Sequence, residues 1–356
     1  MRPAAAGAER LPSTRRHAEK IPDPPSKSRD AARDAPAHPA AVLLAATLPA
    51  ALRDALAARY ALAGPLSPPF AQAVTAMPDA ARAAVRAIVS IGSVAITRDV
   101  LAQFPALGLV CCIGSGHEGV DVAAAHARGV TVAHSPGANA ASVAEVAMGL
   151  LIASVRGFRA EAARIENGGW RGNAQSRATL RHGLAGRRLG IYGMGAIGAA
   201  IARRARAFDM EVGYHNRRPR ADDDTRYFDS LARLAAWCDA LVVSVRAAEA
   251  TRHTVDAEVL AALGADGHVV NIARGNVIDE AALIDALQRG VIAGAGLDVF
   301  EHEPAVPAAL LALPGVVALP HIGGASREAQ AAMQAMTLAN LEAFFAGAPL
   351  PSPVAA

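Results

Sequence analysis

Lysine is nearly absent from this chain of 356 residues. Its two lysines, Lys20 and Lys27, both lie within the first 40 residues, so the remainder of the chain has none. This absence excludes mechanisms that need a lysine amine in the folded body, such as Schiff-base chemistry, a P-loop, or a dehydrogenase with a catalytic lysine. Any chemistry must therefore depend on other side chains.

Cysteine is scarce as well. Cys111, Cys112 and Cys238 have neither C-x-x-C spacing nor a histidine at zinc-site spacing, so we predict no metal site. Three cysteines without a disulfide framework favour a reducing cytoplasm. No apolar run approaches the roughly 18 residues that span a bilayer, so we expect a soluble protein without a membrane partner.

The excess of positive charge belongs to the N-terminal segment. Residues 1–40 hold 8 Lys/Arg and 5 Asp/Glu, a net of +3, which equals the formal charge of the whole chain. The remainder is neutral, which argues against nucleic acid as a partner. Residues 1–40 are rich in Ala, Pro and Arg, with Leu11 and Ile21 as their only large aliphatics, so we expect a disordered tail.

Short apolar runs alternate with Ala-rich helical stretches through the rest of the chain, as is typical of parallel α/β folds. The first series of runs lies at residues 41–46, 87–91, 109–113 and 130–132. Helices are expected at 138–156 and 161–167, and the second series lies at 189–193, 211–215, 241–245, 268–272, 293–298 and 316–320. Six strands are the number expected for a dinucleotide-binding domain.

The last segment, after Gly323, has the pattern of one amphipathic helix. A single helix cannot form a domain, so we expect it to pack on the first series. The predicted fold is two doubly wound parallel-sheet domains, with a Rossmann cofactor domain inserted into a flavodoxin-like substrate domain. The tail would be residues 1–40, the substrate-binding domain 41–139 plus 325–356, and the NAD(P)-binding domain 140–324.

A glycine-rich turn, G-x-G-x-x-G, joins the first strand of the second series to a helix. Gly193 permits the tight turn, Gly195 lets a pyrophosphate approach the backbone, and Gly198 lets helix and strand pack closely. Because a helix N-terminus offers free N–H groups to phosphate, Ala196 and Ile197 at its start are further expected cofactor contacts.

Asn216, Arg217 and Arg218 follow the next strand, where an NAD site normally carries an acid for the ribose 2′-hydroxyl. No acid occurs there before Asp222. Two guanidinium groups instead match a 2′-phosphate. These residues predict NADP as the preferred cofactor, with NAD possible; the alternative for the arginines is a solvated basic turn.

Arg274, Glu303 and His321 each follow one of the last three strands. Strand carboxyl ends face the nicotinamide in such domains, so the three side chains are expected to converge where hydride moves. Singly, each residue has a structural explanation, as a salt-bridge partner, a surface turn and a packed core histidine. Their position on consecutive strand ends favours a chemical site.

These motifs resemble the D-isomer-specific 2-hydroxyacid dehydrogenase family, particularly its glyoxylate, hydroxypyruvate and hydroxyphenylpyruvate reductases. The resemblance rests on residues 113–121, 168–170, 193–198, 214–218, 270–275, 296–300, 303–304 and 320–321. It implies an enzyme that reduces a 2-oxoacid (glyoxylate, hydroxypyruvate, or an aryl or alkyl pyruvate) to the D-2-hydroxyacid with NADPH. Arg274 would bind the substrate, His321 would be the general acid, and Glu303 would pair with it and stabilise its protonated form.

By the same resemblance, the backbone amides of Ser115 and Gly116 would receive the substrate carboxylate, with Gly92 nearby. Asp298 would orient the nicotinamide carboxamide, and Ala273 would be a further cofactor contact. The helix near 138–156 builds a dimer in relatives, so we expect a homodimer.

Other features of the chain leave alternatives open. Residues 91–93, His117 and Trp170 are candidates for the pocket of the substrate side chain, and they do not rank small against aryl 2-oxoacids. Residues 244–248 stand where relatives usually have a proline, which leaves cofactor contacts there open. Retained Arg, Glu and His do not exclude a non-catalytic, NAD(P)-sensing binding protein of the same fold. Formate dehydrogenase is disfavoured because it uses a Gln–His pair.

Overall fold

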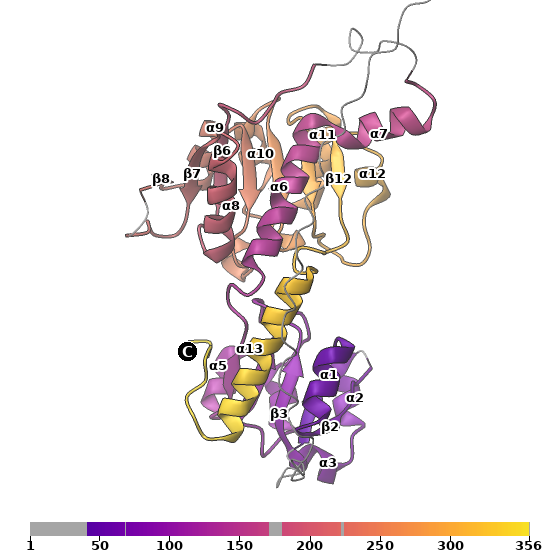
Figure 1. The fold of residues 1–356 in the computed structure, drawn as a ribbon, viewed down its shortest axis with the longest axis vertical. Coiled ribbons are helices and arrows are strands. Elements are labelled where there is room, and N and C mark those ends of the chain that lie inside the picture. Colours follow the sequence, from indigo (N-terminus) through magenta and orange to yellow (C-terminus); the bar gives the residue numbers. More distant parts are fainter. Residues whose placement is uncertain (1–40, 68, 171–179, 222–223, 356) are drawn as a thin grey trace, which may run out of the picture. The chain divides into compact units, whose positions relative to one another are not determined.

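The computed structural model describes residues 41–67, 69–170, 180–221 and 224–355. The predicted disordered tail therefore lies outside the described residues. The described chain forms two parallel sheets, each covered by helices on both faces (Figure 1). This confirms the predicted fold class, two doubly wound α/β units.

The first sheet has five strands in the order β2-β1-β3-β4-β5, which is the flavodoxin-like order. Its strands are β1 (Ala41–Leu44), β2 (Ala61–Ala63), β3 (Val85–Ser90), β4 (Leu109–Cys112) and β5 (Thr131–Ala133). Sequence analysis found four of them and missed β2. That strand is a three-residue edge strand without a buried residue, so no apolar run marks it.

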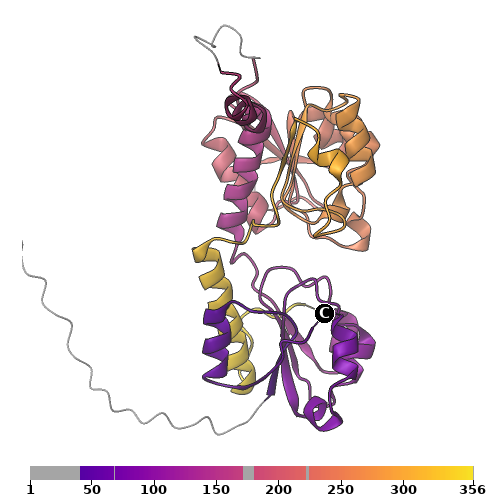
Figure 2. The ribbon, with the colours of Figure 1, turned by 90° about the vertical axis from the view of Figure 1, so that its right-hand side faces the viewer.

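Helices on the two faces of this sheet come from distant parts of the chain. They are α1 (Ala50–Ala57), α2 (Phe70–Thr75), α3 (Asp79–Ala84), α4 (Arg98–Ala102), α5 (Val122–Ala127) and α13 (Arg327–Phe345). Met333 and Leu341 of α13 share a core with Leu52 of α1 and with strand residues such as Val42. Figure 2 shows α1 and α13 beside each other on one face. The last helix is therefore single and packs on the first sheet.

The second sheet has seven strands in the order β12-β11-β10-β9-β6-β7-β8. They are β6 (Arg188–Tyr192), β7 (Glu211–His215), β8 (Arg226–Phe228), β9 (Ala240–Val243), β10 (His268–Asn271), β11 (Gly294–Leu297) and β12 (Val316–Ala318). The expected count of six was wrong because β8, a three-residue edge strand with no buried residue, escaped detection. The order reverses between β6 and β9, and such a switch point is where doubly wound sheets bind ligands.

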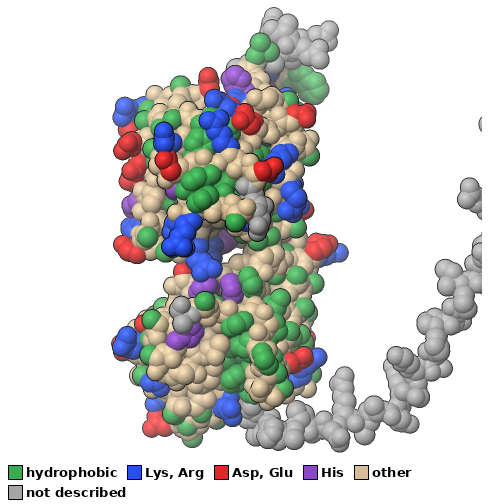
Figure 3. Space-filling view, turned by 90° about the vertical axis from the view of Figure 1, so that its left-hand side faces the viewer, with side chains coloured by type: hydrophobic (Ala, Val, Ile, Leu, Met, Phe, Trp, Pro, Cys, Tyr) green, Lys and Arg blue, Asp and Glu red, His purple; other side chains and the backbone are tan. Residues whose placement is uncertain are grey.

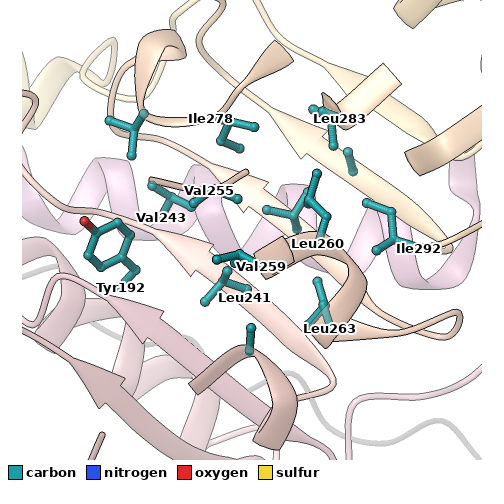
Figure 4. Packing of buried hydrophobic residues seen from close by; sticks show 14 of the residues in the cluster. Tyr192, Leu241, Val243, Val255, Val259, Leu260, Leu263, Ile278, Leu283 and Ile292 are labelled. Atoms are coloured by element: carbon teal, nitrogen blue, oxygen red, sulfur yellow. The ribbon is translucent and has the colours of Figure 1, made fainter. Parts of the chain in front are cut away.

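Two apolar cores cover the faces of this sheet. The helices are α6 (Ala140–Arg156), α7 (Phe158–Glu166), α8 (Ala196–Arg206), α9 (Leu231–Trp237), α10 (Ala257–Leu263), α11 (Glu280–Gln288) and α12 (Ala308–Leu311), with short 3-10 turns at Glu249–Thr251 and Gly275–Val277. Leu151 of α6 and Ile201 of α8 belong to one core. Leu260 of α10 and Leu283 of α11 belong to the other, which Figure 4 shows around Leu241 of β9. The strands are thereby fixed, and their ends position the loops described next.

In the described part of the chain, no single helix has the length and apolarity to cross a membrane. Only α6 and α7 taken together, with a bend of 65° between them, reach the required length and composition.

Candidate active site

The glycine-rich turn has the backbone that a tight strand-to-helix connection requires. Gly193 has φ +104°, and a Cβ there would lie 2.6 Å from the backbone nitrogen of Val245, two residues after β9. A Cβ on Gly198 would collide with the carbonyl oxygen of Gly193. Gly195 differs: it is exposed, and a Cβ there would meet no atom within 4 Å. The turn is closed on its inner side and open at Gly195, beside the N-terminus of α8.

In the basic turn after β7, some side chains hydrogen-bond to the neighbouring glycine-rich turn and others do not. Asn216 Oδ1 accepts a hydrogen bond from the Met194 N–H at 2.7 Å, which ties this turn to the glycine-rich turn. Arg220, which sequence analysis did not select, donates to the Met194 carbonyl oxygen at 2.8 Å. Arg217 and Arg218 are exposed and form no hydrogen bond or ion pair with other described residues. Their guanidinium groups are thus available to an anion.

The side chains of His321 and Glu303 lie next to each other. His321 Nδ1 lies 2.8 Å from Glu303 Oε2, and Glu303 Oε1 accepts from the Phe300 N–H at 3.1 Å. The carboxylate is thereby held on one side by backbone and faces the imidazole on the other. His321 has φ +54°, which is uncommon for a residue with a side chain. Its side chain is 45% exposed, and Nε2 has no partner in the described part of the chain.

Asp298 holds the turn that carries His321. Its Oδ1 accepts from the Ile322 N–H and its Oδ2 from the Gly323 N–H, both at 2.8 Å, and the Asp298 carbonyl accepts from His321 N–H at 2.8 Å. Burial raises the pKa of this carboxyl, although the two amide hydrogen bonds act against that shift. In the structure, Asp298 therefore fixes the backbone beneath the histidine.

Arg274 is oriented by three contacts. Its Nη1 donates to the Ala273 carbonyl oxygen at 2.7 Å, and its Nε is hydrogen-bonded to Glu118 of the loop after β4. Buried Asn271, whose amide donates to the Arg274 carbonyl oxygen at 3.0 Å, shapes the turn. The remaining guanidinium nitrogen, Arg274 Nη2, lies against the backbone of Gly116. A Cβ atom added to Gly116 would collide with this nitrogen. Sequence analysis missed Glu118 because its partner is 156 residues away.

Two of the predicted substrate contacts, Ser115 and Gly116, lie in one loop, residues 114–119. A Cβ on Gly92 would collide with the Gly116 carbonyl oxygen, so these two glycines are in direct backbone contact. Ser115 Oγ lies 3.1 Å from the Ser135 carbonyl oxygen and 3.0 Å from Asn139 Oδ1, and its single proton is donated to one of these two acceptors. The structure therefore brings Gly92, Ser115 and Gly116 together beside Arg274. Trp170, a candidate for the pocket of the substrate side chain, is 66% exposed.

The chain is similar to known proteins in both sequence and structure. The family model of the D-isomer specific 2-hydroxyacid dehydrogenase NAD-binding domain matches residues 148–323. A glyoxylate/hydroxypyruvate reductase from Arabidopsis thaliana is 38% identical over 271 residues, covering 76% of this chain and 83% of that protein. Hydroxyphenylpyruvate reductase from Plectranthus scutellarioides is 36% identical over 270 residues, covering 76% and 85%.

Solved structures resemble the chain over most of its length. An NADPH-dependent glyoxylate/hydroxypyruvate reductase from Sinorhizobium meliloti, in complex with NADP and malonate, has a TM-score of 0.81 and 35% identity, covering 89% of this chain and 97% of that chain. A glyoxylate reductase from Paecilomyes thermophila has a TM-score of 0.80 and 33% identity, covering 88% and 98%.

Proposed function

Because the chain belongs to the D-isomer-specific 2-hydroxyacid dehydrogenase family, we propose that it reduces a 2-oxoacid to the D-2-hydroxyacid with NADPH. The observation that carries this proposal is the His321–Glu303 pair, 2.8 Å apart, beside the carboxyl end of the seven-stranded sheet. Relatives named as glyoxylate, hydroxypyruvate and hydroxyphenylpyruvate reductases support the substrate class.

The glycine-rich turn and the basic turn fit NADP. Open space at Gly195, next to the free N–H groups of α8, suits a pyrophosphate, and the exposed Arg217 and Arg218 suit a 2′-phosphate. Ala196, Ile197, Asn216, Ala273 and Asp298 would complete the cofactor contacts. When bound, the reduced nicotinamide supplies a hydride for C2 of the substrate.

The remaining residues divide the acid–base and binding work. Nδ1 of His321 faces Glu303, so Nε2 is the nitrogen that can deliver a proton to the substrate oxygen. Glu303 would stabilise the imidazolium before that transfer. Arg274 Nη2, with the backbone amides of Ser115 and Gly116, would bind the carboxylate, while Glu118 and the Ala273 carbonyl hold the guanidinium.

The test is NADPH oxidation, followed at 340 nm, with glyoxylate and hydroxypyruvate as substrates. The proposal expects turnover that depends on both the 2-oxoacid and the enzyme. NADPH binding without turnover across a panel of 2-oxoacids, including phenylpyruvate, would instead identify a cofactor-sensing protein.

We also propose that the two sheets have different roles and that the chain forms a homodimer. Residues 41–139 with 325–356 would bind substrate, and residues 140–324 would bind the cofactor. The helix near 138–156 remains the expected dimer helix, and exposed apolar side chains just after it, with Phe158 52%, Ile165 59% and Trp170 66% exposed, support a partner copy there. The free, buried cysteines are compatible with the cytoplasm. Light scattering on the purified chain tests the dimer.

A further inference from the structure

His134 connects the end of the first sheet to the loop that is proposed to bind the substrate carboxylate. It is the first residue after β5, and its Nδ1 lies 2.9 Å from the Ser115 carbonyl oxygen. Since a carbonyl oxygen only accepts hydrogen bonds, Nδ1 carries a proton and donates it. Two further contacts join these segments, from the Ser135 N–H to the Gly114 carbonyl oxygen at 2.9 Å and between Ser115 Oγ and the Ser135 carbonyl oxygen at 3.1 Å. Of these contacts, only the one from His134 ends on the peptide group between Ser115 and Gly116.

The hydrogen bond from His134 fixes the direction of one backbone amide. The peptide group between Ser115 and Gly116 is trans, so it is planar and its C=O and N–H point in opposite directions. Because the Ser115 oxygen is turned toward His134, the Gly116 N–H is turned away from it. Neither this N–H nor the Ser115 N–H donates to another described residue, so both are available to a ligand. Gly116 also lies against the Arg274 guanidinium, the other group that is proposed to bind the carboxylate.

Residues 352–354 hold the backbone of His134 in place, because they pair antiparallel with the edge strand β5. The His134 N–H donates to the Ser352 carbonyl oxygen at 3.2 Å, and Ser352 Oγ donates to the His134 carbonyl oxygen at 2.6 Å. Ser352 Oγ also accepts from the amide of Asn340 on α13 at 2.8 Å, and Asn340 Oδ1 accepts from the Ser352 N–H at 3.2 Å. Ser352 and Asn340 are both buried, so breaking these contacts would leave buried polar groups without a partner.

The imidazole of His134 also packs against His117. The two ring centroids lie 5.0 Å apart with 83° between the ring planes, which is an edge-to-face contact. His117 is itself buried, and its Nε2 lies 3.3 Å from Arg246 Nη1. Figure 3 shows histidine side chains close to one another on one face of the molecule. The backbone, the Nδ1 atom and the ring of His134 thus each have a partner, and its side chain has a defined orientation.

We propose that His134 is a positioning residue for substrate binding: it turns the Gly116 N–H toward the substrate carboxylate, and Ser352 holds His134 where this requires it. The inference rests on the proposed 2-oxoacid reduction and adds residues that act on it through the loop. A peptide oxygen that accepts a hydrogen bond also polarises the N–H of the same peptide group, which strengthens the bond that this N–H donates. The substrate carboxylate keeps its charge throughout the reaction, so the contact stabilises bound substrate and transition state equally. Its loss should therefore raise KM and leave kcat nearly unchanged.

The test compares three variants by the KM for hydroxypyruvate and by the inhibition constant of oxamate, an unreactive carboxylate analogue of pyruvate. His134→Leu removes the donor, so both constants should rise about tenfold while kcat stays within about twofold of the wild type. His134→Asn should keep both constants close to those of the wild type, because its amide can donate to the same oxygen. Ser352→Ala leaves the imidazole present and loosens only its support, so both constants should rise about threefold.

NADPH affinity, from nicotinamide fluorescence, and melting temperature are recorded for each variant, with His126→Leu in the last turn of α5 as the matched control. If His134→Leu and Ser352→Ala leave both constants unchanged, the inference alone is overturned, even where the melting temperature falls. The same holds if His134→Asn is as impaired as His134→Leu, because the effect would not then come from hydrogen-bond donation. Should His134→Leu fail to fold, Ser352→Ala decides. A wild type that turns over no 2-oxoacid would overturn the proposed function and this inference together.

Discussion

The two ends of the seven-stranded sheet carry polar residues in different states. At the amino ends, His268 Nδ1 lies 2.9 Å from Ser154 Oγ, and Arg188 Nη2 lies 3.0 Å from Asp239 Oδ1. Each of these groups has its partner inside the chain. At the carboxyl ends, the side chains of His321 and Arg274 are 45% and 34% exposed, and each keeps a nitrogen that no described residue engages.

The difference teaches where to look for function in a parallel sheet. A polar group whose hydrogen-bonding capacity is satisfied internally contributes to stability, whereas one that is oriented by neighbours but keeps a free donor can bind a ligand. Substitutions of His321 and Arg274 should therefore change catalysis and leave stability nearly intact. Substitutions at the amino ends should do the reverse.

The largest effect is expected at His321. His321→Ala and His321→Gln remove the proton donor, so kcat for 2-oxoacid reduction should fall by a factor on the order of 10² or more. NADPH binding and melting temperature should stay close to those of the wild type. Steady-state kinetics, with His126→Gln as the control, measures this. Unchanged kcat would show that His321 is not the acid.

The preference for NADPH over NADH should change almost as strongly when the basic turn is altered. Replacing Arg217 and Arg218 with alanine removes the two exposed cations, each worth about 1.5–3 kcal/mol in charge-assisted hydrogen bonds. The NADPH/NADH ratio of kcat/KM should fall on the order of 10²-fold. Rising salt should weaken wild-type NADPH binding more than NADH binding. Arg289→Ala, which removes an exposed arginine at the end of another helix, is the control. Equal use of NADPH and NADH by the wild type would refute the proposal that Arg217 and Arg218 bind the 2′-phosphate.

At the amino end, His268 should make stability depend on pH. Burial, followed by nearby arginines, lowers its pKa to about 4 from 6.5. The unfolded chain therefore takes up the proton first as pH falls. The free energy of unfolding should drop between about pH 6.5 and pH 4, by roughly 2–3 kcal/mol in all. His268→Gln should flatten this part of the urea-denaturation profile. A wild-type profile that the substitution leaves unaltered would contradict the assignment.

Asp239 should give the smallest effect. Burial acts to raise the pKa of its carboxyl, but the side-chain and backbone hydrogen bonds from Arg188 outweigh it and lower the pKa. This stabilisation is present above the unfolded pKa and is lost as pH falls through the folded value. Because Arg188 is 41% exposed, Asp239→Ala should cost only about 1–2 kcal/mol at neutral pH. Urea denaturation measures this loss of unfolding free energy. A kcat that falls as far in Asp239→Ala as in the His321 variants would contradict the distinction between the two sheet ends.

What could be predicted from the sequence follows from how local each signal is. Arg274, Glu303 and His321 could be grouped because each follows an apolar strand, and parallel strands end at one edge. The Arg274–Glu118 and Arg246–His117 contacts could not, because they join residues 156 and 129 positions apart. Asn216 was selected as a cofactor contact, and its side chain also fixes the glycine-rich turn through Met194. Strands β2 and β8 could not be predicted because only their hydrogen-bonded pairing with a neighbouring strand defines them, and no apolar run marks them.

One measurement tests the carboxyl end of the sheet as a hydride-transfer site most directly. NADPH deuterated at the reactive position of its nicotinamide is mixed with hydroxypyruvate and enzyme, and the product is examined by mass spectrometry and chiral chromatography. The predicted product is D-glycerate with one deuterium on C2, formed by the wild type and not at a comparable rate by His321→Ala. L-glycerate, product without deuterium, or no product in the presence of bound NADPH would contradict the proposal.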